Sequence, residues 1–535
     1  MTMKSPAVRG PQINQFNNIA PQKIPRSQFI RDFTRRTTFN ADYIVPCFVD
    51  EILPGDDVNI KMNAVVRMAT PIKPLMDNLY LETHWFFVPN RLVWDNWEKF
   101  QGQQTNPGDS TAYTIPVLNH LVEPLSTTGF ETESVYDYFG LPILVSGIEK
   151  ISAMYNRAYD LIWNAWYRDE NLQSSITVPT GDGPDNPALY ELRKRNKRKD
   201  YFTSMLPWPQ KGDAAAIPLA GNAPVISTEN PIQFKDAPGA GLNRNLQFVA
   251  GNTINYTGPV PAGNPNLRFG TDTGLEVDFT ELSAVTINAL RQTALYQQIL
   301  ELDARGGTRY VESIYTRFGV VSPDFRLQLP ELIGQASTRI NVYAVPQTAP
   351  TTDTSTPQGN LAAFGIAQIS GDHGCRYAAT EHGMILGLMN VRADLTYQQG
   401  VPRMFSRQTR LDFYEPLLNG LGEQAIPRKE LYAEGTPVSD NETIGYQERF
   451  SEYRFKNSEI TGKFRSAAPL TMDIWHLAQF FSEAPALNSA FITENVPMDR
   501  VLAVTDESDF LADMAFSYNH VRPMPIRSNP GITKL

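Results

Sequence analysis

His373 and Cys375 are the best candidates for covalent chemistry, because they stand two residues apart in the run Gly371-Asp372-His373-Gly374-Cys375. A histidine that removes the proton of a thiol makes the cysteine nucleophilic. A catalytic pair is defined by its geometry in space, so a short spacing between glycines is weak evidence for one. We expect an ordinary loop histidine and a small buried thiol.

The other enzyme signatures are incomplete. The six histidines form no H-E-x-x-H pair, and the two cysteines form no paired motif for structural zinc. Gly462-Lys463 resembles the end of a phosphate loop, but Asn457 replaces its first glycine and Phe464 replaces its hydroxyl residue. Asp50-Glu51 and Asp56-Asp57 could supply the two carboxylates of a polysaccharide-active enzyme, although acids are common beside turns. We expect no catalytic residue, no metal and no cofactor.

A dense basic run between residues 193 and 199 is a candidate for binding phosphate, since each lysine or arginine can displace a counterion from a nucleic acid. The alternative is a solvated stretch, or one that pairs with acidic groups on a neighbouring copy. Rings suited to base stacking, Tyr201 and Phe202, come only at its end. The candidate contacts are Arg193, Lys194, Arg195, Lys197, Arg198 and Lys199.

The first 36 residues predict a basic arm, because they are rich in proline and asparagine and lack periodicity. Phe16, Phe29 and Phe33 add rings that could stack on bases. The alternative is a chain end that clamps neighbouring subunits through its apolar residues. The candidate contacts with nucleic acid are Lys4, Arg9, Lys23, Arg26, Arg31, Arg35 and Arg36, against the single acid Asp32.

The composition limits the classes of protein. The chain has 535 residues and a formal net charge of −10, so any contact with nucleic acid must come from local basic segments. Its 40 prolines and 35 glycines indicate short elements joined by many turns. Neither a signal peptide nor an apolar run of membrane-spanning length is found, so we expect neither secretion nor membrane insertion.

Strands must position these segments, and three runs predict them. Val58, Ile60, Met62, Ala64, Val66 and Met68 alternate with mainly polar residues, as in a strand with one buried face. A second run places Leu79, Leu81, Trp85 and Phe87 on one face. A third alternates from Ile385 to Tyr397, and shorter candidates lie at residues 339–345 and 445–455. The natural interpretation is antiparallel β-structure.

Helical spacing marks two further stretches. Apolar residues recur every three or four positions over residues 148–165 and 282–302, and the second stretch opens with Asp278 and Glu281 in capping-box positions. Gly306-Gly307 should end that helix, and a short helix is expected over residues 308–318. Residues 212–274 are rich in Ala, Gly, Pro, Asn and Thr, and predict a long surface loop or a small β-protrusion.

Two groups of short sequence motifs, one towards each end of the chain, carry a resemblance to a known family. The N-terminal part of the resemblance includes Phe48-Val49-Asp50-Glu51, Leu53-Pro54-Gly55-Asp56 and Phe86-Phe87-Val88-Pro89-Asn90-Arg91-Leu92-Val93-Trp94. The C-terminal part includes Gly422-Glu423-Gln424-Ala425-Ile426, Gly445-Tyr446-Gln447-Glu448-Arg449, Trp475-His476-Leu477-Ala478-Gln479 and Arg522-Pro523-Met524-Pro525. These motifs resemble the major capsid proteins of Microviridae bacteriophages of the gokushovirus type. The resemblance covers both ends and most of the middle of the chain.

The resemblance implies a mainly β chain with a single eight-stranded jelly-roll β-sandwich, long inserted loops and a few helices. Residues 1–36 would be the arm and residues 37–535 the capsid domain. Sixty copies, assembled through pentamers, would form a T=1 shell around circular single-stranded DNA. The implied partners are a small basic DNA-packaging protein, a scaffolding protein and a host cell-surface receptor. Residues 212–274 are the candidate protrusion that touches the host.

The resemblance also implies a place in the virion capsid and synthesis in the cytoplasm of a bacterial host. A carbohydrate-binding adhesin built on a β-sandwich is the alternative outside enzymes and capsids. An adhesin does not need the basic segment from Lys4 to Arg36, and it should carry a signal peptide.

Overall fold

The computed structural model describes residues 25–215, 225–227, 233–235, 243–249, 253–256, 268–269, 275–277, 287–321, 324, 326–348, 351 and 358–527. The chain divides into two compact units. One unit consists of residues 1–209 and 320–535, and the other consists of residues 210–319. None of the described helices combines the length and the apolar composition that crossing a bilayer requires.

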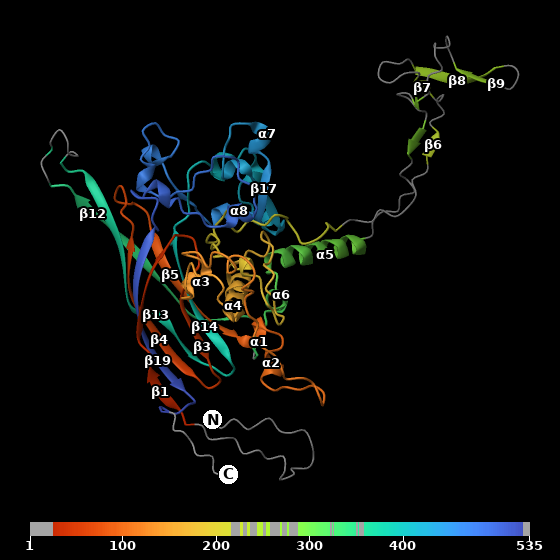
Figure 1. Cartoon of the computed structure of the whole chain (residues 1–535). Helices are drawn as coiled ribbons and strands as arrows, with labels where there is room; N and C mark the ends of the chain where they lie inside the picture. Colours follow the sequence, from red (N-terminus) through yellow and green to blue (C-terminus); the bar gives the residue numbers. More distant parts are fainter. Residues whose placement is uncertain are drawn as a thin grey trace. The chain divides into compact units, whose positions relative to one another are not determined.

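One antiparallel sheet organises the first unit (Figure 1). Its spatial order is β1 (Ser27–Ile30), β19 (Phe510–Arg522), β4 (Asp57–Met68), β13 (Leu361–Ala378), β12 (Glu331–Pro346), β5 (Leu79–Pro89), β14 (Gly383–Ala393) and β3 (Val45–Ile52), while β2 (Phe33–Phe39) also pairs with β19. Neighbours in this sheet are far apart in the sequence. Such an order is typical of a jelly roll, in which Greek-key connections place early and late strands side by side.

The sheet has two halves joined by β12. Its residues 331–340 pair with β5, whereas residues 341–346 pair with β13. The expected number of eight strands is reached only when β1 and β2, which pair with the two ends of β19, are counted as one interrupted strand. The predicted fold class, mainly β with a jelly-roll sheet and a few helices, is confirmed.

Aromatic side chains fill the interior where the sheet curls onto itself. Phe33 and Phe48 come from β2 and β3, at opposite ends of the strand order, yet their ring centres are 5.9 Å apart. Phe516 of β19 stacks on Phe33 at 4.8 Å and lies 6.3 Å from the ring of Trp85 in β5. Burial of such large rings supplies much of the stability of a β-sandwich core.

The predicted alternation in β4 is confirmed. All six apolar residues from Val58 to Met68 are buried, and Lys61, Asn63 and Arg67 between them are exposed. The run of Leu79, Leu81, Trp85 and Phe87 in β5 is also buried. Successive strand residues point to opposite faces, so the pattern in the sequence reports directly which face meets the core.

The third predicted run is shorter and more deeply buried than its alternation indicates. β14 ends at Ala393, and Tyr397 belongs to the separate β15 (Thr396–Tyr397). Every residue of β14 is buried, including the polar Asn390 and Arg392. The reason is that other parts of the chain cover both faces of this strand, as in sheets packed between two layers.

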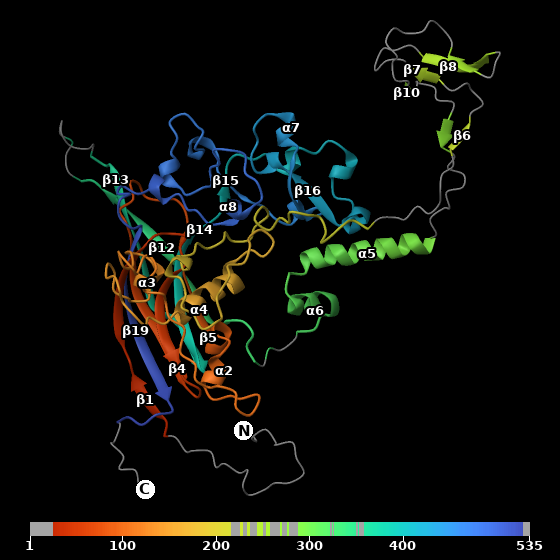
Figure 2. The same ribbon diagram turned by 45° about the vertical axis from the view of Figure 1, so that its right-hand side comes forward.

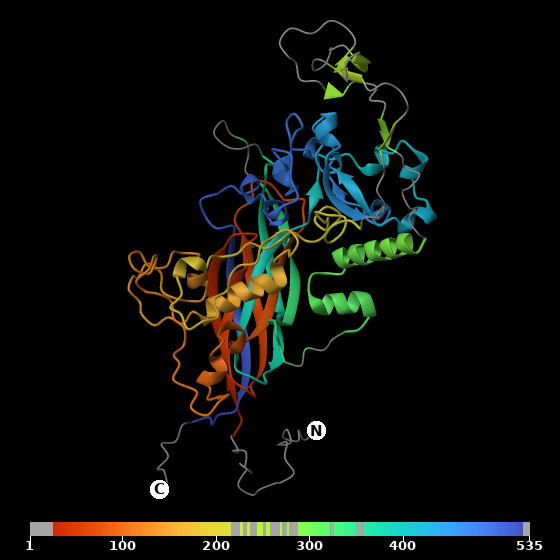
Figure 3. The ribbon, with the colours of Figure 1, turned by 90° about the vertical axis from the view of Figure 1, so that its right-hand side faces the viewer.

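Helices of the first unit cover the half of the sheet that contains β5 and β14. They are α1 (Asn90–Val93), α2 (Trp97–Phe100), α3 (Val135–Tyr138) and α4 (Met154–Ile162), and a π-helical turn, Trp163–Tyr167, follows α4. Figure 3 shows α4 lying across the sheet, where Ala158 and Ile162 share a buried cluster with Phe86 and Leu386. Trp94 is fully buried in the same cluster, so it belongs to the core of the subunit.

The segment after β14 forms a group of short elements at one end of the sheet (Figure 2). They include β16 (Glu423–Pro427), β17 (Thr443–Glu448), β18 (Ser458–Glu459), α7 (Pro437–Asp440) and α8 (Ser489–Ile492). The strand expected over residues 445–455 ends at Glu448. Phe450 then adopts a left-handed conformation with φ of 60°, which a strand does not tolerate.

The second unit contains six short strands and two helices within the described residues. They are β6 (Val225–Ser227), β7 (Gln233–Lys235), β8 (Asn243–Val249), β9 (Thr253–Tyr256), β10 (Arg268–Phe269), β11 (Leu275–Val277), α5 (Ile287–Arg305) and α6 (Tyr310–Phe318). As predicted, a helix ends just before Gly306 and a short helix follows. The capping residues Asp278 and Glu281 lie outside the described residues.

Candidate nucleic-acid interface

The basic run at residues 193–199 is an extended segment tied to the body of the subunit by its backbone. Ile44 donates to the carbonyl of Arg193 at 2.9 Å, and Arg195 donates to the carbonyl of Asp42 at 2.8 Å. On the other side, Lys197 donates to the carbonyl of Ile492 at 2.8 Å. The run is therefore held between two distant stretches of the chain and is not a free loop.

Three of its cations have carboxylate partners inside the same subunit. Arg193 Nε lies 3.1 Å from Asp160 Oδ1, and Arg195 and Lys199 form ion pairs with other acids. Those acids are Glu82 and Asp169. Much of the positive charge that made the run a phosphate-binding candidate is thus neutralised locally.

The other three cations lack a carboxylate partner among the described residues. Lys197 is buried, with its ammonium 4.8 Å from the ring centre of Phe491, and burial lowers its pKa. Lys194 lies 5.1 Å from the ring centre of Tyr43. Arg198 is exposed. Lys194 and Arg198 are accordingly the members of the run best placed to meet an external phosphate, which stays a prediction.

The fold also changes which aromatic rings accompany the run. Tyr201 and Phe202 are buried, so they cannot stack on bases. A pocket of about 370 Å³ lies beside the run, and Trp166, 47% exposed, lines it with Arg198. Nothing in the sequence linked this ring to the basic run, because Trp166 precedes the run by about thirty residues.

The described part of the predicted arm belongs to the sheet. Arg31 forms an ion pair with Asp50, and Arg36 Nε lies 3.4 Å from Asp513 Oδ1. Arg26 and Arg35 donate to backbone carbonyls, among them that of Cys47 at 3.2 Å from Arg35 Nη1. Lys4, Arg9 and Lys23 lie outside the described residues.

His373 and Cys375 do not form a catalytic pair. They lie in β13 at a bulge and not in the loop that we expected. The ring of His373 lies between two hydroxyls, 2.8 Å from Thr83 and 2.7 Å from Thr338, and burial lowers its pKa. Burial raises the pKa of Cys375 to about 12, so the thiol is not a nucleophile at neutral pH. The prediction of a small buried thiol is confirmed.

Two of the carboxylates considered for sugar chemistry, Asp50 and Asp56, have structural partners within the subunit. Asp56 is buried and accepts from Arg522 Nε at 3.0 Å, while its Oδ2 lies 2.9 Å from His520 Nε2. Asp50 accepts from the hydroxyl of Tyr518 at 2.6 Å. Among the described residues no group of three or more His, Cys, Asp or Glu could hold a metal ion.

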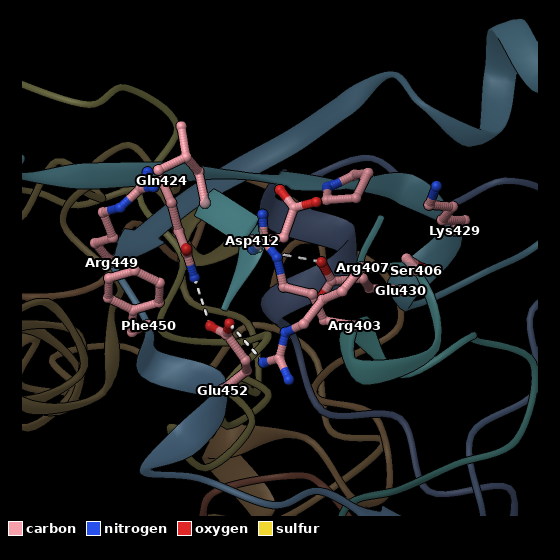
Figure 4. A pocket seen from close by; sticks show the side chains of 12 residues that line it. Arg403, Ser406, Arg407, Asp412, Gln424, Lys429, Glu430, Arg449, Phe450 and Glu452 are labelled. Carbon is pink, nitrogen blue, oxygen red and sulfur yellow. Dashed lines mark hydrogen bonds and ion pairs between the residues drawn. The ribbon is translucent and has the colours of Figure 1, made fainter. Parts of the chain in front are cut away.

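A pocket of about 220 Å³ in the segment after β14 is lined by seven charged side chains (Figure 4). Arg407 Nη2 and Gln424 Nε2 point toward the two oxygens of Glu452 and donate to them at 3.1 and 2.8 Å. Arg403 Nη1 lies 3.5 Å from Glu430 Oε1. Glu430 and Glu452 are each held by an arginine, whereas Asp412 accepts from the backbone N–H groups of Gln408 and Thr409, so the pocket can bind a charged group but presents no acid–base pair.

Burial of Glu430 sets its protonation. Burial raises the pKa of this carboxyl to about 7, although Arg403 and the hydroxyl of Tyr201, which donates at 3.0 Å, oppose the rise. Near neutral pH the carboxyl therefore neutralises Arg403 only in part. No signal in the sequence pointed to this site, because its parts come from separate short segments.

Comparison with known proteins identifies one family. Residues 17–532 match a family model described as Capsid protein (F protein). The chain is 46% identical to the capsid protein VP1 of Bdellovibrio phage phiMH2K over 525 residues, which cover 96% of each chain. It is 38% identical to the capsid protein VP1 of Chlamydia phage 1 and 33% identical to that of Spiroplasma virus 4, with 98% of each chain covered in both cases.

Proposed function

The chain belongs to the phage capsid protein (F protein) family, and from this premise we propose that sixty copies close into a T=1 icosahedral shell around a circular single-stranded DNA genome. Membership makes it a structural protein of the capsid and not an enzyme, and the resemblance to gokushovirus-type capsid proteins is confirmed. The number of copies and the enclosed genome are the proposal.

The observation that carries the proposal is the apolar surface of the isolated subunit. Leu417, Val438 and Leu470 are 89%, 86% and 86% exposed. Exposed apolar side chains on a stable jelly-roll body favour association, and in a shell of identical copies each subunit meets its neighbours through repeated contacts. Many individually weak contacts then add up to a closed particle.

Particle mass tests the assembly. The purified chain, expressed with its scaffolding partner, should give shells of about 3.6 MDa, sixty times the 60.0 kDa of one chain, or pentamers that convert to them. Light scattering gives the mass, and negative-stain images give the diameter and symmetry. A stable monomer that never assembles would contradict the proposal.

The genome requires positive charge that this chain does not supply by itself. The chain carries a net charge of −10, and Arg193, Arg195 and Lys199 are neutralised within the subunit. We expect the arm at residues 1–36, together with Lys194 and Arg198, to contact DNA, and a small basic packaging protein to neutralise the rest. Complete DNA-filled particles containing this chain alone would refute the need for that protein.

The insertion at residues 212–274 is proposed as the protrusion that meets a host cell-surface receptor. Support comes from its composition and from the separate compact unit at residues 210–319 that contains it. Replacing residues 212–274 by a short Gly-Ser linker should leave shell formation intact but abolish adsorption to the bacterial host, in whose cytoplasm the chain is made. Unchanged adsorption would exclude this role.

A further inference from the structure

A pocket of about 550 Å³ adjoins the charged pocket of Figure 4 and shares Arg403, Arg407, Glu430 and Glu452 with it. Its remaining lining comes mainly from residues 397–405 and 453–465. Cavities that hold a nucleotide-sized ligand fall in this range of volume. All of the pocket belongs to the first unit, and all of its lining residues are described.

Aromatic rings at this pocket remain open to solvent. Phe405 is 72% exposed, Phe455 is 61% exposed and Tyr453 is 49% exposed. The guanidinium of Arg407 lies 4.3 Å from the ring centre of Tyr453 and fixes that ring in place. Phe405 and Phe455 make no such contact among the described residues, so two apolar rings stand unpaired at the rim of one pocket.

Cations outnumber acids around the same pocket. The lining contains five cationic side chains and three carboxylates, although the chain as a whole is acidic. Lys456 and Arg465 are exposed and have no carboxylate partner among the described residues. The side chain of Arg407 is 10% exposed, and its Nε has no acceptor in the described part of the chain. This buried N–H group is available to donate to an acceptor on a bound molecule.

We propose that this pocket binds single-stranded nucleic acid, with bases stacked on Phe405 and Phe455 and phosphates beside Lys456 and Arg465. Proteins that hold single strands without reading their sequence combine a cationic groove with aromatic rings on which successive bases stack. In the segment Tyr453-Arg454-Phe455-Lys456, aromatic rings that can stack on bases alternate with cations that can contact phosphates. The site gives the proposed genome enclosure a specific contact, and it rests on that proposed function.

Binding of a fluorescein-labelled oligo-dT to the full-length chain, followed by anisotropy over a range of salt concentrations, separates the two parts of the site. The double variant Phe405→Ala/Phe455→Ala should weaken binding at least about 30-fold with an unchanged salt dependence, because two stacking contacts and no phosphate contact are lost. The double variant Lys456→Gln/Arg465→Gln should reduce the slope of log K against log salt by about 1.4, because two phosphate contacts are lost.

Two matched controls lie outside the pocket. Phe318→Ala removes an aromatic side chain that is 74% exposed, close to the 72% of Phe405, and Arg376→Gln removes an exposed cation on β13. Both should bind the oligonucleotide like the parent chain, and thermal unfolding should show that all variants fold. Photocrosslinking with iodouracil in the oligonucleotide should label peptides that contain residues 403–407 and 453–456, which distinguishes this site from the arm.

Three outcomes would overturn the site. In the first, the parent chain does not bind the oligonucleotide. In the second, the stacking variant binds as tightly as the controls, and the crosslinks fall outside the pocket. In the third, the stacking variant no longer assembles but keeps its affinity for DNA. The last would assign the pocket to contact between copies. If the pocket variants bind DNA and form DNA-filled shells like the parent chain, the pocket inference fails but the proposed shell stands. If binding depends on the pocket but the chain never assembles, the proposed shell fails but the pocket inference stands.

Discussion

Arg195 of the basic run and Glu82 of β5 form an ion pair within one subunit. The same carboxylate accepts from Arg392 Nε at 2.6 Å, so it holds two arginines from distant segments. Burial opposes the ionisation of Glu82, but the two arginines outweigh it and keep the pKa of the carboxyl below its ordinary value. The densest basic segment of the chain is therefore anchored to the sheet.

Loss of the Glu82 carboxylate should destabilise the subunit strongly. Glu82→Gln removes the nearer of the two carboxylates that neutralise Arg392, whose side chain is 4% exposed, and leaves only Asp394 at 3.5 Å. Removing one member of a buried ion pair costs about 3–5 kcal/mol of unfolding free energy. Urea denaturation measures the change. Arg198→Gln, in the exposed part of the same run, is the control and should shift the unfolding free energy by less than about 0.5 kcal/mol. Equal stability of the two variants would contradict the anchoring role.

The pH dependence of stability should report on Glu494. Burial raises the pKa of this carboxyl to about 7, and the nearby Asp42 adds to the rise. The folded state then binds the proton more tightly than the unfolded chain, so this stabilisation is complete below about pH 4.5 and is lost as the pH rises through about 7.

Glu494→Gln should therefore stabilise the subunit at pH 8 by about 1–3 kcal/mol and have little effect near pH 5. Thermal unfolding at a series of pH values measures the difference. Glu507→Gln, at an exposed position, should leave the pH profile unchanged. A Glu494→Gln profile parallel to that of the parent chain would show that the carboxyl is ionised normally.

The interior face of β19 should be far more sensitive than its outer face. Phe516 is buried among Phe33, Phe48 and Trp85, whereas the nearby Leu511 is 51% exposed on the same strand. Phe516→Ala should cost about 3–5 kcal/mol through lost burial and a residual cavity, and Leu511→Ala should cost much less. Thermal unfolding and soluble yield compare them. Similar losses for both would contradict the assigned faces.

Neither cysteine should react in the native subunit. Cys47 is fully buried, Cys375 is 7% exposed, and burial raises the pKa of each thiol to about 12. Since the thiolate is the reactive species, a chromogenic disulfide reagent should find no fast thiol in the native protein and two after denaturation. Rapid reaction of one thiol at neutral pH would place it at the surface.

Patterns with a local cause were predictable from the sequence. The alternation from Val58 to Met68 follows from the two-residue period of a strand, so both the element and its buried face were correct. The helix before Gly306 was also predicted, because glycine readily ends a helix. The prediction that a strand continues beyond Glu448 was wrong, because Phe450 adopts a left-handed conformation that depends on its surroundings in the fold.

Partners across the fold were not predictable. Nothing near Arg195 in the sequence indicated Glu82, and nothing near His373 indicated that Thr83 and Thr338 would enclose it. The pocket around Phe405 and Phe455 joins segments whose separate compositions are ordinary. Such contacts depend on sheet order and on where long connections return.

The sequence by itself determined the mainly β class, the buried face of β4 and the resemblance to a capsid family. These features depend on the periodicity of apolar residues and on short motifs, both of which are local in the sequence. Only the tertiary structure decided which charges are free. Most of the run from Arg193 to Lys199 is paired or buried, whereas Lys456 and Arg465 are open to solvent. The physical reason is that the net charge of a side chain's surroundings depends on neighbours in space, which strand order brings together from distant parts of the sequence.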